Sequence, residues 1–193
     1  MDFVEGLPKS EGCDSIMVVV DRLTKFAQFV PLHHPFMAAQ VARPFWEHIT
    51  KLHGVPCSIL SDQDKIFTSV MWRELLVVAR TKLLYSTAYH PQMDGKTERV
   101  NQCLEMYLRC AVHDTPRQWR KWLAAAEFWY NSTHQASLKC SLFRALYDVD
   151  PNLGGLPHYN ADMKPSAPAR ELDWAAHTER FRAQLARAQP RFK

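Results

Sequence analysis

Three carboxylates in this sequence could together perform phosphodiester chemistry. Asp62 follows a short apolar run, and Glu98 follows the breaker-rich segment 91–95, with 35 residues between the two acids. A third acid, Asp2, opens an apolar stretch at the N-terminus. Carboxylate oxygens are the ligands that Mg²⁺ and Mn²⁺ prefer, and two such ions can hold both the attacking and the leaving oxygen of a phosphodiester. The residues therefore predict a site for two divalent metal ions.

Ordinary structural roles could also explain these acids, because the chain has 20 Asp and Glu residues. Asp62 could cap the N-terminus of the helix that follows, and Glu98 could be an exposed helix residue. Asp64 could support Asp62 from outside a metal site. Spacing alone leaves these alternatives open.

The hydrophobic pattern predicts the elements that would position the acids. Predicted strands cover residues 2–7, 15–21, 26–32, 57–60 and 82–86, the second and third forming a hairpin. Predicted helices cover residues 38–52, 69–80, 96–112, 119–130 and 172–188. The apolar residues expected to face inward are Val41, Phe45, Trp46, Ile49 and Leu52 in the first helix, Trp72, Leu75, Leu76 and Ala79 in the second, and Val100, Leu104, Tyr107, Leu108 and Ala111 in the third. The order of strands and helices predicts an α/β fold in which helices flank a mixed sheet.

The predicted elements also explain how the acids could meet. Strand ends share one edge of an open α/β sheet, where Asp62 would lie, and Asp2 begins the first strand. Glu98 falls in the first turn of its helix, close to Val100 and Leu104 on the inward face. Three carboxylates brought this close repel one another unless cations neutralise them.

The composition of the chain differs between a predicted core and a basic C-terminal segment. Residues 1–150 form the predicted core, residues 151–170 a linker containing Pro and Gly, and residues 171–193 a basic amphipathic helix. The net charge is +4, and the segment from Lys164 onward, with seven basic and three acidic residues, carries all of it. A basic tail suits a polyanion such as DNA, although a solvated helix face would look the same.

Several classes of protein are excluded by composition. A hydrophobic content of 47% excludes a disordered chain, and no apolar run reaches the ~18 residues of a membrane span. The five cysteines are widely spaced and odd in number, which indicates buried thiols in a reducing compartment rather than disulfides or a zinc site. Three tryptophans at helical spacing, Trp119, Trp122 and Trp129, are interpreted as core or interface residues.

Several short blocks in one order carry a family resemblance. They are Met1-Asp2-Phe3-Val4-Glu5-Gly6-Leu7-Pro8, Val18-Val19-Val20-Asp21-Arg22-Leu23-Thr24-Lys25, His53-Gly54-Val55-Pro56, Thr87-Ala88-Tyr89-His90-Pro91-Gln92, Thr97-Glu98-Arg99-Val100-Asn101-Gln102 and Trp129-Tyr130-Asn131. The chain resembles the integrase core domain of LTR retrotransposons, in particular the Ty3/gypsy class, within the retroviral-type integrase superfamily. The resemblance covers nearly the whole chain.

The resemblance implies a fold and an activity. The fold would be RNase H-like, a mixed five-stranded sheet flanked by helices, with a C-terminal helical extension. Asp2, Asp62 and Glu98 would form a D,D-35-E catalytic triad that binds two Mg²⁺ or Mn²⁺ ions. The enzyme would process the 3′ ends of the element's DNA and transfer them into target DNA. The resemblance also implies a homo-oligomer and a nuclear location, with no membrane involved.

The same resemblance suggests where DNA would bind. The segment Tyr89–Gly95 looks like a flexible active-site loop that contacts the DNA end. His90 and Gln92 belong to this loop, while Lys96 and Arg99 flank Glu98 and could contact phosphates. His53, before Gly54, is interpreted as part of a helix C-terminus rather than a ligand.

Departures from the family pattern affect the expected activity and stability. Arg80 and Asp148 stand where the family usually has Gly, and Gly at position 80 would permit a positive φ at a helix end. The chain begins one residue before Asp2, so we expect a shortened first strand and weak or no integration by the chain alone.

Two other functions fit the same residues. One is a non-catalytic nucleic-acid-binding or assembly fragment on the same fold, derived from a degenerate or domesticated integrase core. The other is a nuclease of RNA–DNA hybrids, against which the 35-residue spacing and the missing fourth acid argue.

Overall fold

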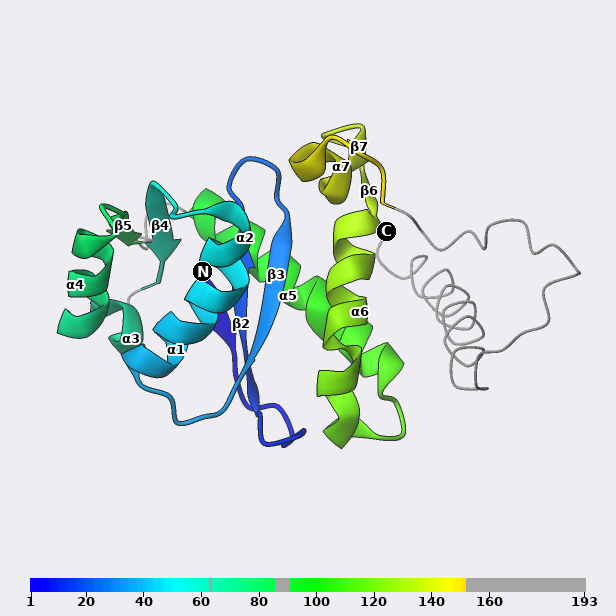
Figure 1. Cartoon of the computed structure of the whole chain (residues 1–193). Coiled ribbons are helices and arrows are strands. Elements are labelled where there is room, and N and C mark those ends of the chain that lie inside the picture. Colours follow the sequence, from blue (N-terminus) through cyan, green and yellow to red (C-terminus); the bar gives the residue numbers. More distant parts are fainter. Residues whose placement is uncertain (63, 86–90, 152–193) are drawn as a thin grey trace, which may run out of the picture. The chain divides into compact units, whose positions relative to one another are not determined.

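A computed structural model describes residues 1–62, 64–85 and 91–151, and for residues 91–96 it describes the backbone only. The chain divides into two compact units, Met1–Asp150 and Pro151–Lys193. Apart from Pro151, the predicted linker and basic helix lie outside the described residues, as does His90. The account below concerns the first unit (Figure 1).

The strands are β1 (Asp2–Val4), β2 (Ser15–Val20), β3 (Ala27–Leu32), β4 (Ser58–Ser61), β5 (Lys82–Tyr85), β6 (His134–Gln135) and β7 (Cys140–Ser141). The helices are α1 (Ala38–Phe45), a π-helical turn η1 (Trp46–Thr50), α2 (Lys51–His53), α3 (Lys65–Thr68), α4 (Val70–Val78), α5 (Pro91–Ala111), a 3-10 turn η2 (Pro116–Gln118), α6 (Trp119–Ser132) and α7 (Leu142–Tyr147).

The first three strands form an antiparallel sheet in the order β1-β2-β3. The predicted hairpin of β2 and β3 is confirmed, with Ser15 opposite Leu32 and Val20 opposite Ala27. The side chain of Asp21 stabilises the turn by accepting hydrogen bonds from the backbone of Leu23 and Thr24. Strand β1 is short, and its register places Asp2 opposite Val18.

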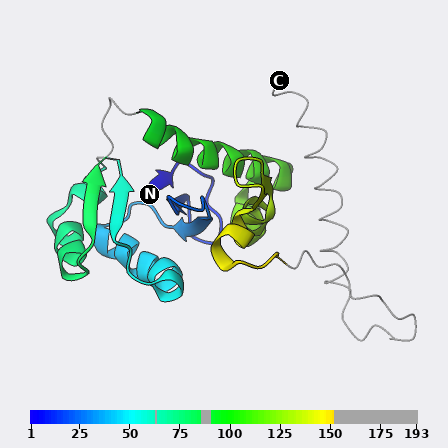
Figure 2. The ribbon, with the colours of Figure 1, turned by 90° about the horizontal axis from the view of Figure 1, so that it is seen from above.

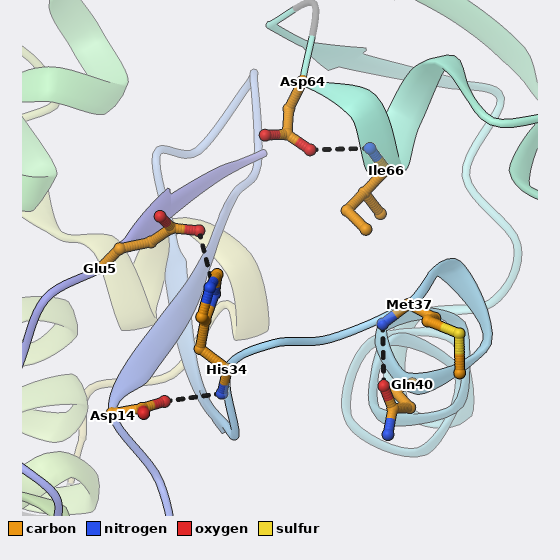
Figure 3. Close-up of polar contacts among 7 residues, drawn as sticks. All are labelled: Glu5, Asp14, His34, Met37, Gln40, Asp64 and Ile66. Atoms are coloured by element: carbon orange, nitrogen blue, oxygen red, sulfur yellow. Dashed lines mark hydrogen bonds and ion pairs between the residues drawn. The ribbon is translucent and has the colours of Figure 1, made fainter.

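Strands β4 and β5 pair in parallel, and α3 and α4 connect them. Asp64, rather than Asp62, caps α3, because its side chain accepts a 2.7 Å hydrogen bond from the backbone N–H of Ile66 (Figure 3). Helix α4 buries Trp72 and Leu76 as predicted. In the same view, Gln40 accepts from the N–H of Met37 at the start of α1, and Asp14 accepts from the N–H of His34.

A continuous five-stranded sheet was expected, and the described residues do not form one. The ladders fall into a three-stranded sheet, the β4-β5 pair and the small β6-β7 pair. Strand β1 pairs with β2 over three residues. Its link to β4 is one hydrogen bond of 2.7 Å, from the Met1 amino nitrogen to the Leu60 carbonyl oxygen. The α/β class is confirmed, whereas the prediction of a single sheet is wrong for this part of the chain.

The helix predicted over residues 38–52 is interrupted. Pro44 lies inside α1, and the π-helical turn η1 follows it. A π turn contains more residues than an α turn, so side chains beyond it rotate around the axis. Val41, Phe45 and Ile49 are buried as predicted, but Trp46 and Leu52, also predicted to face inward, are exposed.

Helices α5 and α6 pack beside the antiparallel sheet, and the view from above shows α1 and α5 on opposite sides of it (Figure 2). Helix α5 buries Val100, Leu104, Tyr107 and Leu108, as its spacing predicts. Trp119 is fully buried and donates to the Pro8 carbonyl, whereas Trp122 and Trp129 are half-buried. The interpretation of the tryptophans as packing residues is confirmed for Trp119.

Side chains of α6 cover the outer edge of β3. The Glu127 carboxylate accepts a 2.8 Å hydrogen bond from the Phe29 N–H. The Asn131 amide both accepts from the Ala27 N–H and donates to the Ala27 carbonyl. Together these bonds satisfy backbone groups that an edge strand would otherwise leave unpaired.

The prediction of buried cysteines is wrong. Cys57 is exposed, and Cys13, Cys103, Cys110 and Cys140 are half-buried free thiols. None of the five belongs to the hydrophobic cluster around Phe67 and Trp72, whose buried members are aliphatic and aromatic. Within the described ranges, no helix combines the length and apolar character that crossing a membrane requires.

Candidate active site

Asp2 is held at the start of β1 by groups from two directions. The Asn101 side chain on α5 donates a 2.7 Å hydrogen bond from Nδ2 to Asp2 Oδ2. The backbone N–H of Phe3 donates to Asp2 Oδ1 at 2.8 Å. Asp2 is half-buried, so both carboxylate oxygens are oriented by neutral donors in a partly desolvated position.

Asp62 lies one residue beyond the end of β4, as the sequence predicted. Burial raises the pKa of Asp62, and the negative charges of Asp2 and Asp64 raise it further. A hydrogen bond from the Asp64 N–H and the charge of the Met1 amino group act in the opposite direction on that pKa. The 2.7 Å hydrogen bond from the Met1 amino nitrogen to the Leu60 carbonyl oxygen brings the start of β1, with Asp2, to the end of β4, which Asp62 follows.

Glu98 is exposed on α5, and Gln102, one turn further along, approaches its Oε1 with a long 3.4 Å hydrogen bond. Asn101, which holds Asp2, lies on the same helix three residues after Glu98. The helix that carries the third acid therefore also orients the first.

One cavity of about 840 Å³ has all three predicted acids in its wall. Asp2 and Asp62 come from the ends of β1 and β4, and Glu98 comes from α5, together with its neighbour Thr97. The cavity is also lined by Arg22 and by residues of β2, β4, α1 and η1.

The carboxylate donors suit a hard divalent cation, and the repulsion between Asp2 and Asp62 is what such a cation would relieve. The three acids are nevertheless not packed closely around one point. In the described ranges, no three His, Cys, Asp or Glu side chains are grouped closely enough to hold one ion. The donor chemistry of the three acids therefore fits a divalent metal ion, although the three side chains do not form such a close group.

The predicted DNA contacts are only partly covered by the structure. His90 lies outside the described residues, and Gln92 and Lys96 are described by their backbone alone. Segment 91–95, predicted as a loop, is instead the first part of α5. Proline is well tolerated in the first turn of a helix, because the N–H that it lacks has no partner there. Arg99 is exposed beside Glu98.

Sequence reasoning missed Asn101 as a functional residue. Its position three residues after Glu98, one helical turn away, could have indicated that it shares a face with that acid. The approach of β1 to this helix, however, is a tertiary contact between residues 99 positions apart.

The His53 imidazole contacts the Gln28 side chain on β3 at 2.8 Å. His53 is the last residue of α2, and Gly54, which caps that helix, has a φ of 77°. This agrees with the interpretation of His53 as part of a helix end.

Comparisons with known proteins give the family. No family model matches the chain. It is 35% identical over 156 residues to the Transposon Tf2-3 polyprotein of Schizosaccharomyces pombe, and equally to the Tf2-4 polyprotein. The match takes in 81% of this chain but only 12% of each relative.

Solved structures show the fold. An intasome of simian T-cell lymphotropic virus, in complex with the PP2A regulatory subunit B56 gamma, aligns with a TM-score of 0.64 and 16% identity over 86% of this chain and 58% of that one. The HTLV-2 integrase catalytic core in complex with magnesium (trimeric form) aligns with a TM-score of 0.58 and 17% identity. That match covers 74% of this chain and 92% of the HTLV-2 chain. The catalytic core of BIV integrase aligns with a TM-score of 0.58 and 18% identity, over 76% of this chain and 93% of the BIV chain.

The fold is thus that of retroviral integrase catalytic cores, and the sequence is related to transposon polyproteins of which it spans about an eighth. With three acids on one cavity in this fold, the chain belongs to the family of integrase core domains of LTR retrotransposons.

Proposed function

We propose that the chain is the catalytic core of a metal-dependent polynucleotidyl transferase from a Ty3/gypsy-type element. It would process the 3′ ends of retrotransposon DNA and transfer them into target DNA. The observation that supports this most directly is that Asp2, Asp62 and Glu98, from three separate elements, line one cavity.

In this proposal the three carboxylates hold two Mg²⁺ or Mn²⁺ ions, which when bound would activate the attacking oxygen and stabilise the charge on the leaving oxygen. Asn101 keeps the Asp2 carboxylate oriented toward the cavity. Water attacks near the 3′ end of the element's DNA and exposes a 3′-hydroxyl, which then attacks a phosphodiester of the target. Because each step is a direct displacement, the protein forms no covalent intermediate.

DNA is the proposed partner, through the phosphate backbone of both the element end and the target. Arg99, exposed beside Glu98, is the proposed phosphate contact among the residues whose side chains are described, together with His90, Gln92 and Lys96 from the sequence. We also propose that the domain acts as a homo-oligomer and in the nucleus, where chromosomal DNA is the target.

The test is Mn²⁺-dependent joining of a short labelled DNA duplex, comparing the chain with Glu98→Gln and Asp62→Asn. The matched control is Glu105→Gln, which removes an exposed acid from the same helix further from the cavity. Products from the parent and the control, but not from the two site variants, would support the proposal. Equal products from all four proteins would contradict it.

A second candidate is a non-catalytic nucleic-acid-binding or assembly fragment. The observation that favours it is the open arrangement of the acids, since the described side chains bring no three metal-binding groups together. This candidate predicts DNA binding that is independent of divalent metal and insensitive to Glu98→Gln, with no joined product. A fluorescence-anisotropy titration with and without EDTA separates the two candidates.

A further inference from the structure

Phe3, the residue after Asp2, joins the first strand to the helix that follows Asp62. Its ring stacks on the ring of Phe67 in α3, with centroids 5.0 Å apart and an angle of 5° between the planes. Successive residues of a strand face opposite sides, so Asp2 reaches Asn101 on α5 while Phe3 packs against the hydrophobic cluster. One step along the strand therefore separates a candidate metal ligand from an aromatic contact.

Phe67 is held from several sides. Its side chain is fully buried, and its ring also contacts the ring of Trp72, with 5.6 Å between centroids. Its backbone carbonyl accepts a 3.2 Å hydrogen bond from the hydroxyl of Tyr85 at the end of β5. A ring packed in this way cannot shift without disturbing its neighbours, so Phe67 gives Phe3 a fixed support.

The helix that carries Phe67 also orients Asp62. Asp64 caps α3, and its backbone N–H donates to Asp62 Oδ1 at 3.2 Å. On the other side of the stack, the backbone N–H of Phe3 donates to Asp2 Oδ1 at 2.8 Å. The two rings therefore connect the backbone groups that orient the two carboxylates.

A second aromatic contact reaches Phe3 from the segment between β3 and α1. The centroid of the Phe36 ring lies 4.9 Å from that of Phe3. His34 anchors this segment, because its N–H donates to Asp14 at 2.6 Å and its Nδ1 lies 3.9 Å from Glu5 Oε1 (Figure 3). Phe3 thus has aromatic contacts from two different segments of the chain.

We propose that Phe3 and Phe67 are positioning residues, whose ring stack sets the placement of Asp2 relative to Asp62. The stack acts through packing, since neither ring carries a group that could ligate a cation. Residues that orient metal ligands affect metal affinity without touching the ion. The inference rests on the proposed function only in naming a divalent metal as the ligand of the two acids. The coupling between β1 and α3 can be measured without metal.

The first test measures this coupling by amide hydrogen exchange in metal-free protein. Phe3→Leu keeps an apolar side chain but removes the ring. The readouts are the N–H groups of Asp64, bonded to Asp62, and of Thr68, which donates to the Asp64 carbonyl at 3.0 Å. We expect both to exchange about two- to tenfold faster, the range that corresponds to the loss of one aromatic pair.

The matched control is Phe29→Leu. Phe29 lies on β3 of the same sheet, and its ring contacts Tyr130 on α6 rather than α3, with 6.1 Å between centroids. This substitution should leave the exchange of the two α3 reporters unchanged. Equal acceleration by Phe3→Leu and Phe29→Leu would indicate a general loss of stability and would overturn the proposal.

The second test measures Mn²⁺ affinity by calorimetry in a double-mutant cycle of Phe3→Leu and Phe67→Leu. Each substitution should raise the Kd about two- to tenfold, and the pair should raise it no further than the larger single effect, because either one removes the same stack. Additive effects would contradict the proposal. Phe3→Tyr, which keeps the ring, should stay within about twofold of the parent.

Comparing Phe3→Leu with Phe3→Tyr keeps the second test decisive if Phe67→Leu fails to fold. A Kd unchanged in Phe3→Leu but raised in Asp62→Asn would overturn the positioning role and leave the metal site intact. Absence of Mn²⁺ binding by the parent would instead contradict the proposed function, and the exchange measurement would then decide the coupling by itself.

Discussion

The Asn101 amide donates to the Asp2 carboxylate at 2.7 Å, and this bond ties the first strand to the helix that carries Glu98. Asn101 is half-buried, and its Oδ1 has no hydrogen-bond partner among the described residues. The hydrogen bond to Asp2 is thus the contact that the Asn101 side chain makes among the described residues, which indicates that Asn101 positions the Asp2 carboxylate.

Replacing Asn101 by Ala should lower the free energy of unfolding by about 1–2 kcal/mol, because a hydrogen bond to a charged, partly buried group is lost. Chemical denaturation measures this effect. Gln102→Ala, at the exposed neighbouring position, should change stability by less than about 0.5 kcal/mol. A role in positioning Asp2 also predicts that Asn101→Ala weakens any Mg²⁺-dependent stabilisation; an unchanged Mg²⁺ response would leave Asn101 a purely structural role.

Divalent cations should stabilise the fold if the three acids bind them. At a Mg²⁺ concentration about 100 times the Kd, the gain is about 2.7 kcal/mol, or about 5 °C or more in Tm. The measurement is a thermal melt with Mg²⁺, with Mn²⁺ and with EDTA. Asp62→Asn should abolish the shift and Glu105→Gln should keep it. A Tm shift of the same size in Asp62→Asn would place the bound ion elsewhere.

Glu127 should make stability depend on pH. Burial raises the pKa of Glu127, and the hydrogen bond from the Phe29 N–H only partly opposes this. A raised pKa means that the folded state binds the proton more tightly than the unfolded state. The associated stability is therefore fully present below the unfolded pKa and is lost as the pH rises through the folded pKa.

Glu127→Gln should therefore be more stable than the parent at pH 7, because a neutral amide oxygen can still accept from the Phe29 N–H. The difference should shrink as the pH falls toward 4. Urea denaturation at both pH values checks this. A Gln variant that is less stable at pH 7 would mean that the charged hydrogen bond outweighs the cost of burial.

Arg80 and Asp148, where the family usually has Gly, both adopt the left-handed conformation, with φ of 54° and 59°. Each follows the end of a helix, where this conformation disfavours side chains other than Gly. Arg80→Gly should raise the free energy of unfolding by about 0.5–1 kcal/mol, measured by denaturation. Arg80→Ala keeps the Cβ atom and should give no comparable gain; an equal gain from Ala would exclude the backbone explanation.

The sequence by itself determined the local elements and the types of residue at the site. A nearly uninterrupted run of β-branched and apolar residues set the buried strand β2 of the β2-β3 hairpin, and the apolar spacing of Val100, Leu104 and Leu108 set the inward face of α5. Asp62 could be singled out because it follows a short apolar run, and Glu98 because it follows the segment 91–95, which contains Pro and Gly. These signals are local, since they depend on the periodicity of side chains along one element.

Only the tertiary structure decided how the elements join. The cap by Asp64, the π turn after Pro44 and the helical start of α5 depend on backbone geometry that apolar spacing does not report. The contact of Asn101 with Asp2 joins segments 99 residues apart. The division of the strands into the β1-β2-β3 sheet and the β4-β5 pair depends on which strand edges form backbone hydrogen bonds with each other. A hydrophobic pattern specifies the faces of a strand but not its neighbours, so it does not predict this division.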